Sequence, residues 1–220
     1  MEDALLNKAY FGLITAAVLA AALAGCSSAP QTGVAQGKLV YNTCVPCHGE
    51  NGGGNARLRA PSIAGLPEWY LVRQLQNFQK DVRGAQADDM EGHRMRPMAR
   101  SLYRAGDLEA VSKYVAGMPI VPQPASLTLG DRVAGEARYT SVCIACHGPD
   151  GKGMEAVGSP RLAGQADWYL YLQLQKFHSG MRGTHPDDMY GAQMRAMSMT
   201  LEDSTAMHDV VAYIRTLPAQ

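Results

Sequence analysis

Apolar residues recur at helical spacing in two segments of the chain, one from Pro67 to Gly84 and one from Ala166 to Gly183. In each segment four apolar side chains share one helical face, and these are Leu71, Leu75, Phe78 and Val82, then Leu170, Leu174, Phe177 and Met181. Further helices are predicted over 33–45, 107–117, 131–144 and 202–217. The sequence lacks the persistent apolar–polar alternation of a half-buried strand. It therefore predicts an all-α protein.

The two halves of the chain are copies of one unit. Displacing the sequence by 99 residues lays 44–119 on 143–218 without a gap, and 29 of the 76 paired residues are identical. A proline-rich segment from Pro119 to Pro124 joins the copies and favours an extended, semi-rigid connection. The duplication predicts two tandem domains, 33–122 and 123–220.

An apolar, alanine-rich run from Tyr10 to Gly25 precedes the first copy. It ends in Leu-Ala-Gly followed by Cys26, which resembles the lipobox of bacterial lipoproteins, where the cysteine is acylated. The run is shorter than the ~20 residues of a membrane-spanning helix and suits a signal peptide. We expect residues 1–26 to be a lipoprotein signal peptide or, alternatively, an uncleaved membrane anchor. Either would hold the protein on the periplasmic face of a bacterial membrane.

The formal net charge of the 220 residues is zero, which argues against a nucleic-acid-binding protein, because such proteins neutralise phosphates with excess lysine and arginine. The charge is unevenly distributed. Residues 33–122 contain 11 basic and 8 acidic side chains, whereas residues 123–220 contain 8 and 10. The first domain therefore has a positive formal net charge and the second a negative one.

Four of the five cysteines occur in two pentapeptides that occupy the same position in the repeat. These are Cys44-Val-Pro-Cys47-His48 and Cys143-Ile-Ala-Cys146-His147. Two sulfurs one turn apart can form thioethers with the vinyl groups of haem, and the following histidine can then reach the iron. A zinc site or a dithiol redox pair uses the same cysteine spacing but does not require the histidine. The motifs predict two covalently bound haem c groups, with His48 and His147 as iron ligands.

Methionine is the residue type that could supply the second axial ligand in both copies. The remaining histidines have no histidine counterpart in the other copy, and these are His93, His178, His185 and His208. Methionine recurs as Met90/Met189, Met95/Met194 and Met98/Met197. The first pair follows two aspartates in each copy, a polar setting that favours a loop. The residues alone leave Met95/Met194 and Met98/Met197 as candidates.

The two motifs and the repeat resemble the class I cytochromes c of the di-haem c4 type over essentially all of 33–220. In that family the ligand methionine lies seven residues before a leucine that precedes the last helix. Leu102 and Leu201 occupy the leucine positions, so the resemblance implies Met95 and Met194 as ligands. Pro97 also fits the family pattern, whereas Ala196 departs from it.

The resemblance also implies contacts around the haem. The carbonyl oxygens of Pro61 and Pro160, each followed after two residues by Ala-Gly, would accept a hydrogen bond from Nδ1 of the iron-bound histidines. Three residues of each copy would line the haem or bind its propionates, or serve as core and helix-end residues. They are Trp69, Tyr70 and Arg83, with Trp168, Tyr169 and Arg182.

Histidine–methionine ligation leaves no vacant position on the iron, which indicates an electron carrier and not an enzyme. The resemblance implies transfer of single electrons from a quinol-oxidising complex or dehydrogenase to a terminal oxidase. The alternatives are a tightly bound subunit of a larger oxidoreductase or oxidase complex, and a di-haem enzyme such as a peroxidase. The enzyme would require a different ligand set at one haem, whereas both methionines recur.

Arginines surround Met95 but not Met194. Arg94, Arg96 and Arg100 have only Arg195 as a counterpart in the second copy. We expect an electropositive docking face for an acidic redox partner on the first domain, the alternative being that these arginines merely solvate a loop.

Overall fold

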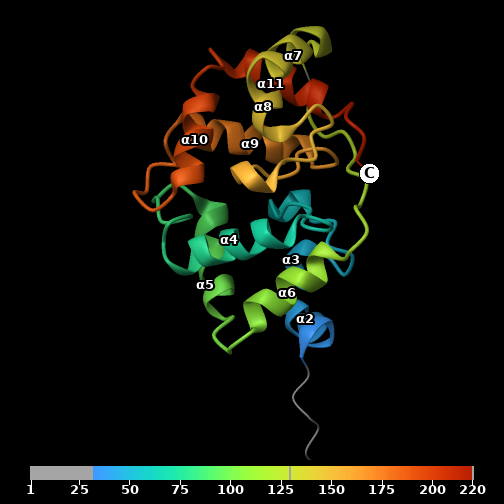
Figure 1. Ribbon diagram of the computed structural model, residues 1–220, viewed down its shortest axis with the longest axis vertical. Helices are drawn as coiled ribbons and strands as arrows, with labels where there is room; N and C mark the ends of the chain where they lie inside the picture. The colour runs from blue at the N-terminus through green and yellow to red at the C-terminus, as the bar shows by residue number, and fades with distance from the viewer. Residues whose placement is uncertain (1–31, 129, 220) are drawn as a thin grey trace, which may run out of the picture. The chain divides into compact units, whose positions relative to one another are not determined.

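Each half of the chain is a set of helices around its own apolar core in the computed structural model, which describes residues 32–128 and 130–219 (Figure 1). The first half contains α2 (Gly33–Tyr41), α3 (Val45–His48), η2 (Ala56–Leu58), α4 (Glu68–Gln79), α5 (Met90–Arg100) and α6 (Asp107–Ala116). The second contains α7 (Arg132–Arg138), η3 (Tyr139–Cys143), α8 (Ile144–His147), η4 (Glu155–Val157), α9 (Asp167–His178), α10 (Met189–Ser198) and α11 (Ser204–Ile214). Within these described ranges, β-pairing is limited to the isolated bridges Asn55–Ala60 and Met154–Ser159. The predicted all-α fold is confirmed.

The first and last helices of each half cross in direct backbone contact, α2 with α6 and α7 with α11. A glycine stands at each crossing because a side chain has no room there. A Cβ on Gly37 would lie 2.1 Å from the carbonyl oxygen of Ala110, and one on Gly135 would lie 1.9 Å from that of Asp209. Glycine therefore sets how closely these helices approach.

The apolar faces of α4 and α9 contribute to the two cores, and five of their eight predicted residues are buried, namely Leu71, Phe78, Leu170, Leu174 and Phe177. Val82 and Met181, predicted on the same faces, lie beyond the ends of the helices. Both helices nevertheless end five residues earlier than predicted, at Gln79 and His178. The helical path stops because Asp81 and Gly180 adopt left-handed backbone conformations, with φ of 62° and 80°.

Helices α5 and α10, which carry all the recurring methionines, occur where no helix was predicted. Their glycines and polar residues, and Pro97 within α5, obscure a helical pattern. Side-chain caps and close packing stabilise both helices despite this weak pattern. The side chains of Asp89 and Asp188 accept the N–H groups of Gly92 and Gly191, each at 2.9 Å. Met90 and Met189 thus begin helices, and the expectation of a loop there was wrong.

The second half accommodates one residue more than the first just before its cysteine motif. Tyr41 lies three residues before Cys44, whereas Tyr139 lies four before Cys143. The extra residue is absorbed by η3, a single π-helical turn. The two tyrosines keep the same role, since their hydroxyls donate to the carbonyls of Gly49 at 2.6 Å and Gly148 at 2.7 Å. The gapless repeat therefore starts at the cysteine.

The proline-rich segment 119–124 and the residues that follow it form hydrogen bonds with both halves. The Gln123 side chain donates to the carbonyl of Gly53 at 3.2 Å, and the backbone N–H groups of Ser126 and Leu127 donate to the carboxylate of Asp167 at 2.8 and 3.2 Å. These contacts fix the two ends of the linker and hold the two halves together.

Residues 1–26, including Cys26, lie outside the described residues. Among the helices of residues 32–128 and 130–219, none has the length and apolarity needed to cross a bilayer.

Candidate functional site

The two attachment motifs adopt the same local structure. Cys44 and Cys143 stand at the N-terminal ends of the short helices α3 and α8, and the second cysteine and the histidine of each motif lie within the helix. Gly49 and Gly148 end these helices with φ of 77°, a conformation that favours glycine. The sulfurs of each motif are therefore separated by one helical turn, as thioether attachment to one haem requires.

Both motif histidines are buried and oriented by a proline carbonyl. His48 Nδ1 lies 2.9 Å from the Pro61 carbonyl oxygen, and His147 Nδ1 lies 2.9 Å from that of Pro160. A carbonyl oxygen can only accept, so Nδ1 carries the proton and the lone pair remains on Nε2. Burial lowers the pKa of both histidines, partly offset by these bonds, which keeps the imidazoles neutral. Each histidine is thus in the state that binds iron through Nε2.

The thiols do not have the properties of a dithiol redox pair. Such a pair needs a first cysteine whose pKa is lowered to favour the thiolate. Burial instead raises the pKa of Cys44, and it raises that of Cys143 to about 11. Before haem attachment these sulfurs are protonated, which argues against the redox alternative.

The three recurring methionine pairs differ in exposure along α5 and α10. Met90 and Met189 are 64% and 58% exposed, and Met98 and Met197 are 40% and 41% exposed. Met95 and Met194 are half-buried, and Met194 packs against the apolar core of the second half. Met95 and Met194 are therefore more buried than the other two pairs.

A crossed hydrogen-bond network of two arginines and two glutamines joins the halves. Arg83 donates to Gln74 Oε1 at 2.6 Å and across to Gln173 Oε1 at 3.3 Å, whereas Arg182 donates to Gln173 Oε1 at 2.6 Å and across to Gln74 Oε1 at 3.2 Å. The Tyr169 hydroxyl accepts a further bond from Arg83 at 3.1 Å. Equivalent residues of the two copies therefore face each other.

This network has an excess of positive charge. In the described part of the chain, neither Arg83 nor Arg182 forms an ion pair with a carboxylate, and the Nε atom of each is buried without a partner. Burial raises the pKa of Tyr169, but the charges of Arg83, Arg182 and Lys176 and the hydrogen bond from Arg83 together bring it below its ordinary value. An anionic group fits beside these guanidinium groups.

The residues present fit a haem in each half. The motif supplies two sulfurs and an oriented neutral imidazole, the neighbouring helix supplies a half-buried methionine, and the buried guanidinium groups suit the carboxylates of haem propionates. The indole rings of Trp69 and Trp168 pack against the following tyrosine rings with centroids 5.9 and 5.7 Å apart.

The arginines near Met95 are less available than the sequence suggests. Arg96 and Arg100 both pair with Asp81, each at 2.5 Å, whereas Arg94 is exposed. The second copy has Gly180 in place of Asp81. The expected patch of three arginines is therefore partly neutralised within its own domain, on the helix α5 and not on a loop.

Sequence reasoning missed the glutamines of the crossed network and the aspartates that cap α5 and α10. These residues occupy equivalent positions in the two copies, as the pairs Gln74/Gln173 and Asp89/Asp188. This identity was the available signal, because a polar residue that is the same in both copies is a candidate for the same structural role in each. Lys176, which reaches Asp89 across the two halves, has no such signal, since Asn77 occupies its position in the first copy.

Known proteins match both halves. The cytochrome c family model matches residues 34–119 and 133–218. A thiosulfate dehydrogenase electron acceptor from Stutzerimonas stutzeri (strain A1501) is 32% identical over 186 residues, which cover 76% of this chain and 82% of that protein.

Two solved structures resemble the fold and share more than a quarter of its sequence. Reduced cytochrome c4 from Pseudomonas stutzeri matches with a TM-score of 0.67 and 27% identity, over 86% of this chain and 100% of that one. Thiosulfate dehydrogenase from Marichromatium purpuratum matches with a TM-score of 0.68 and 31% identity, over 84% of this chain and 40% of that one. The chain thus spans the whole of the first structure but under half of the second.

Proposed function

Because the chain belongs to the cytochrome c family and binds two covalent haem c groups in tandem domains, we propose that it carries single electrons between membrane respiratory complexes. The observation that supports this best is the equivalence of the two sites. Each has a buried histidine held by a proline carbonyl and an inward methionine at the same position of the repeat. Two like sites suit electron transfer, whereas an enzyme would need one of them to differ.

The haem supplies reversible one-electron chemistry at iron when bound. Cys44 and Cys47 hold the first group, and Cys143 and Cys146 hold the second. The carbonyl of the proline behind each histidine fixes the ring orientation and increases its basicity.

We propose that Met95 and Met194 would supply the second protein ligand of each haem iron. Their half-buried position supports this choice over the more exposed Met98 and Met197. A thioether ligand together with the imidazole would raise the potential of the iron and would leave no coordination position for a substrate. Methionine ligation in both domains therefore gives a carrier suited to the high-potential end of a respiratory chain.

The crossed network would hold the two haem groups in a set relation. Arg83 and Arg182 lie at the contact between the domains and would offset the propionate charges. Each arginine donates to a glutamine of its own domain and to one of the other domain, so the network would link the surroundings of the two haem groups through hydrogen bonds. This supports transfer between the two haems within one molecule.

The donor is proposed to be a quinol-oxidising complex or a dehydrogenase, and the acceptor a terminal oxidase. One relative is a thiosulfate dehydrogenase electron acceptor, which supports a dehydrogenase as the donor. The experiment mixes the oxidised protein with a thiosulfate dehydrogenase and thiosulfate or, in parallel, with a quinol-oxidising complex and quinol. Haem reduction is followed by absorbance, and reoxidation is followed after adding a terminal oxidase.

Catalytic reduction of both haems by one donor, followed by oxidase-dependent reoxidation, is the expected result. Omission of either enzyme is the matched control, because direct reaction with thiosulfate or oxygen must be slower. A protein that neither donor reduces, or that itself turns over peroxide, would contradict the proposed role as a carrier.

The proposed location is the periplasmic face of a bacterial membrane, held by a lipid at Cys26 or by an uncleaved N-terminal helix. The lipobox-like segment supports it. Intact-mass measurement of the native protein and of Cys26→Ser separates the cases. Loss of acyl mass on substitution supports the lipoprotein, a mature chain beginning at Met1 supports the helix, and a chain with neither contradicts both.

A further inference from the structure

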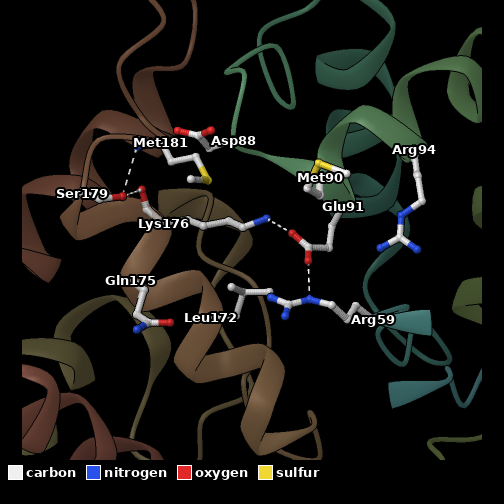
Figure 2. A pocket seen from close by; sticks show the side chains of 10 residues that line it. All are labelled: Arg59, Asp88, Met90, Glu91, Arg94, Leu172, Gln175, Lys176, Ser179 and Met181. Carbon is white, nitrogen blue, oxygen red and sulfur yellow. Dashed lines mark hydrogen bonds and ion pairs between the residues drawn. The ribbon is translucent and has the colours of Figure 1, made fainter. Parts of the chain in front are cut away.

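A cleft of about 400 Å³ lies between α5 of the first domain and α9 of the second (Figure 2). Inside it, the Lys176 amine contacts Glu91 Oε2 at 2.5 Å and also Asp89 Oδ1. The second oxygen of Glu91 pairs with Arg59, as the dashed lines in Figure 2 show. The side chains of Lys176 and Asp89 are only 6% and 2% exposed, so this ion pair is buried, and Arg59 lies at the exposed edge of the ion-pair cluster.

The cluster contacts the start of the helix that carries Met95. Asp89 is the N-cap of α5, and the same oxygen that meets Lys176 accepts the Gly92 N–H at 2.9 Å. Glu91 lies in the first turn, where a carboxylate interacts favourably with the helix dipole. Met95 follows one turn later. A residue of the second domain thus fixes the beginning of a helix in the first.

The second domain lacks the equivalent contact. Asp188 caps α10 through Gly191 in the same way, but the position equivalent to Lys176 is Asn77. The start of α10 is contacted instead by Arg73 of the first domain. The Arg73 guanidinium group lies 4.1 Å from the centroid of the Tyr190 ring and donates to the Gly158 carbonyl oxygen at 2.5 Å. In the described residues, the Gly191 N–H is the one hydrogen-bond donor to the Asp188 side chain.

We propose that Lys176 is a cross-domain positioning residue that stabilises α5 and, through it, the bond between Met95 and the first haem iron. Within the part of the chain that the structure describes, the N-cap of α10, Asp188, has no such ion pair, and the cross-domain contact there is the stacking of Arg73 on Tyr190. The start of α5 is therefore held by charge and the start of α10 is not. This rests on the assignment of Met95 and Met194 as ligands. Release of Met95 should therefore require less perturbation when Lys176 is absent, whereas release of Met194 should not change.

The test measures each site alone. Met194→Ala leaves the sulfur-to-iron charge-transfer band of the Met95 site, and Met95→Ala leaves that of the Met194 site. In each background the oxidised protein is titrated with alkali, and the pH at which half the band disappears is recorded. Lys176→Gln removes the charge, Lys176→Arg keeps it, and Asn77→Lys offers the missing contact to Asp188.

Lys176→Gln should lower the midpoint of the Met95 site by about one pH unit, a tenfold change in the equilibrium between bound and released methionine. The reason is that the buried Asp89 carboxylate loses its cationic partner, whereas Glu91 keeps Arg59. The Met194 midpoint should stay unchanged, Lys176→Arg should restore most of the Met95 value, and Asn77→Lys should raise only the Met194 midpoint.

An unchanged Met95 midpoint in Lys176→Gln, or equal shifts at both sites, would overturn the proposal. If Lys176→Gln does not fold, Asn77→Lys decides, since no rise at the Met194 site counts against the mechanism. Failure of the ligand assignment has a different signature, because the single-methionine backgrounds would then lack the expected bands before Lys176 is changed.

Discussion

The crossing of α2 and α6 allows a sharp prediction for Gly37→Ala. The new Cβ would lie 2.1 Å from the carbonyl oxygen of Ala110, whereas ordinary contact begins at 3.4 Å. The obstacle is backbone, so a rotamer change cannot relieve it and the helices must separate by 1.3 Å. Tyr41, which ends α2 and is 2% exposed, would move with the helix and loosen its hydrogen bond to Gly49.

The expected cost follows from two opposing effects. Overpacking a core costs up to ~3 kcal/mol, and replacing a helical glycine by alanine returns up to ~1 kcal/mol. The first domain should therefore lose about 2 kcal/mol in its free energy of unfolding. At an m value of ~2 kcal/mol per M, its urea midpoint should fall by about 1 M.

Urea titration of the oxidised protein, followed by the charge-transfer band, measures this loss. Half of the band should disappear about 1 M earlier in Gly37→Ala than in the parent. Gly117→Ala is the matched control, because a Cβ there meets its nearest atom at 3.5 Å and should change little. A Gly37→Ala protein that unfolds with the parent would refute the view that this glycine sets the approach of the helices.

Three further predictions concern haem loading, docking and pH. Cys143→Ala combined with Cys146→Ala should leave one covalent haem per chain by haemochrome assay, because each domain holds its own group; loss of both would refute independent attachment. Arg94→Gln should reduce the salt dependence of electron exchange with an acidic partner more than Arg100→Gln does, because Arg100 already pairs with Asp81; equal effects in stopped-flow measurements would count against this docking face. Burial raises the pKa of Asp89, but hydrogen bonds from Lys176 and Gly92 and the charges of Lys176 and Arg83 together hold it below its ordinary value of 3.8. Its stabilisation should therefore be present above pH 3.8 and be lost as the pH falls through the lowered pKa. The difference in unfolding free energy between the parent and Lys176→Gln should shrink on acidification through this range, and a constant difference would rule out the carboxylate as the partner.

The sequence predicted the residues whose chemistry is local. The cysteine–histidine motifs are contiguous, and the apolar face of α4 follows one helical period, so both could be recognised without knowing the fold. The choice of Met95 over Met98 required the family pattern, because both recur in the repeat. The structure adds that Met98 is 40% exposed.

The features that were not predicted depend on contacts between distant residues. Helix α5 is stabilised by the Asp89 cap and by packing of Gly92 against Gly84, neither of which produces an apolar period. The pairing of Arg96 with Asp81 depends on the left-handed turn after α4, which its sequence does not reveal. A helical pattern predicts which face is buried, but tertiary contacts decide where such helices begin and end.

The intensity of the sulfur-to-iron charge-transfer band per chain tests the central claim most directly. The oxidised protein, with its haem content determined independently, should show the band at the intensity of two histidine–methionine sites. Met95→Ala should remove half of it, and Met98→Ala should leave it intact, since Met95 is the inward residue of the two. A band of one site or none in the parent, or a full band in Met95→Ala, would contradict a carrier with two equivalent six-coordinate haems.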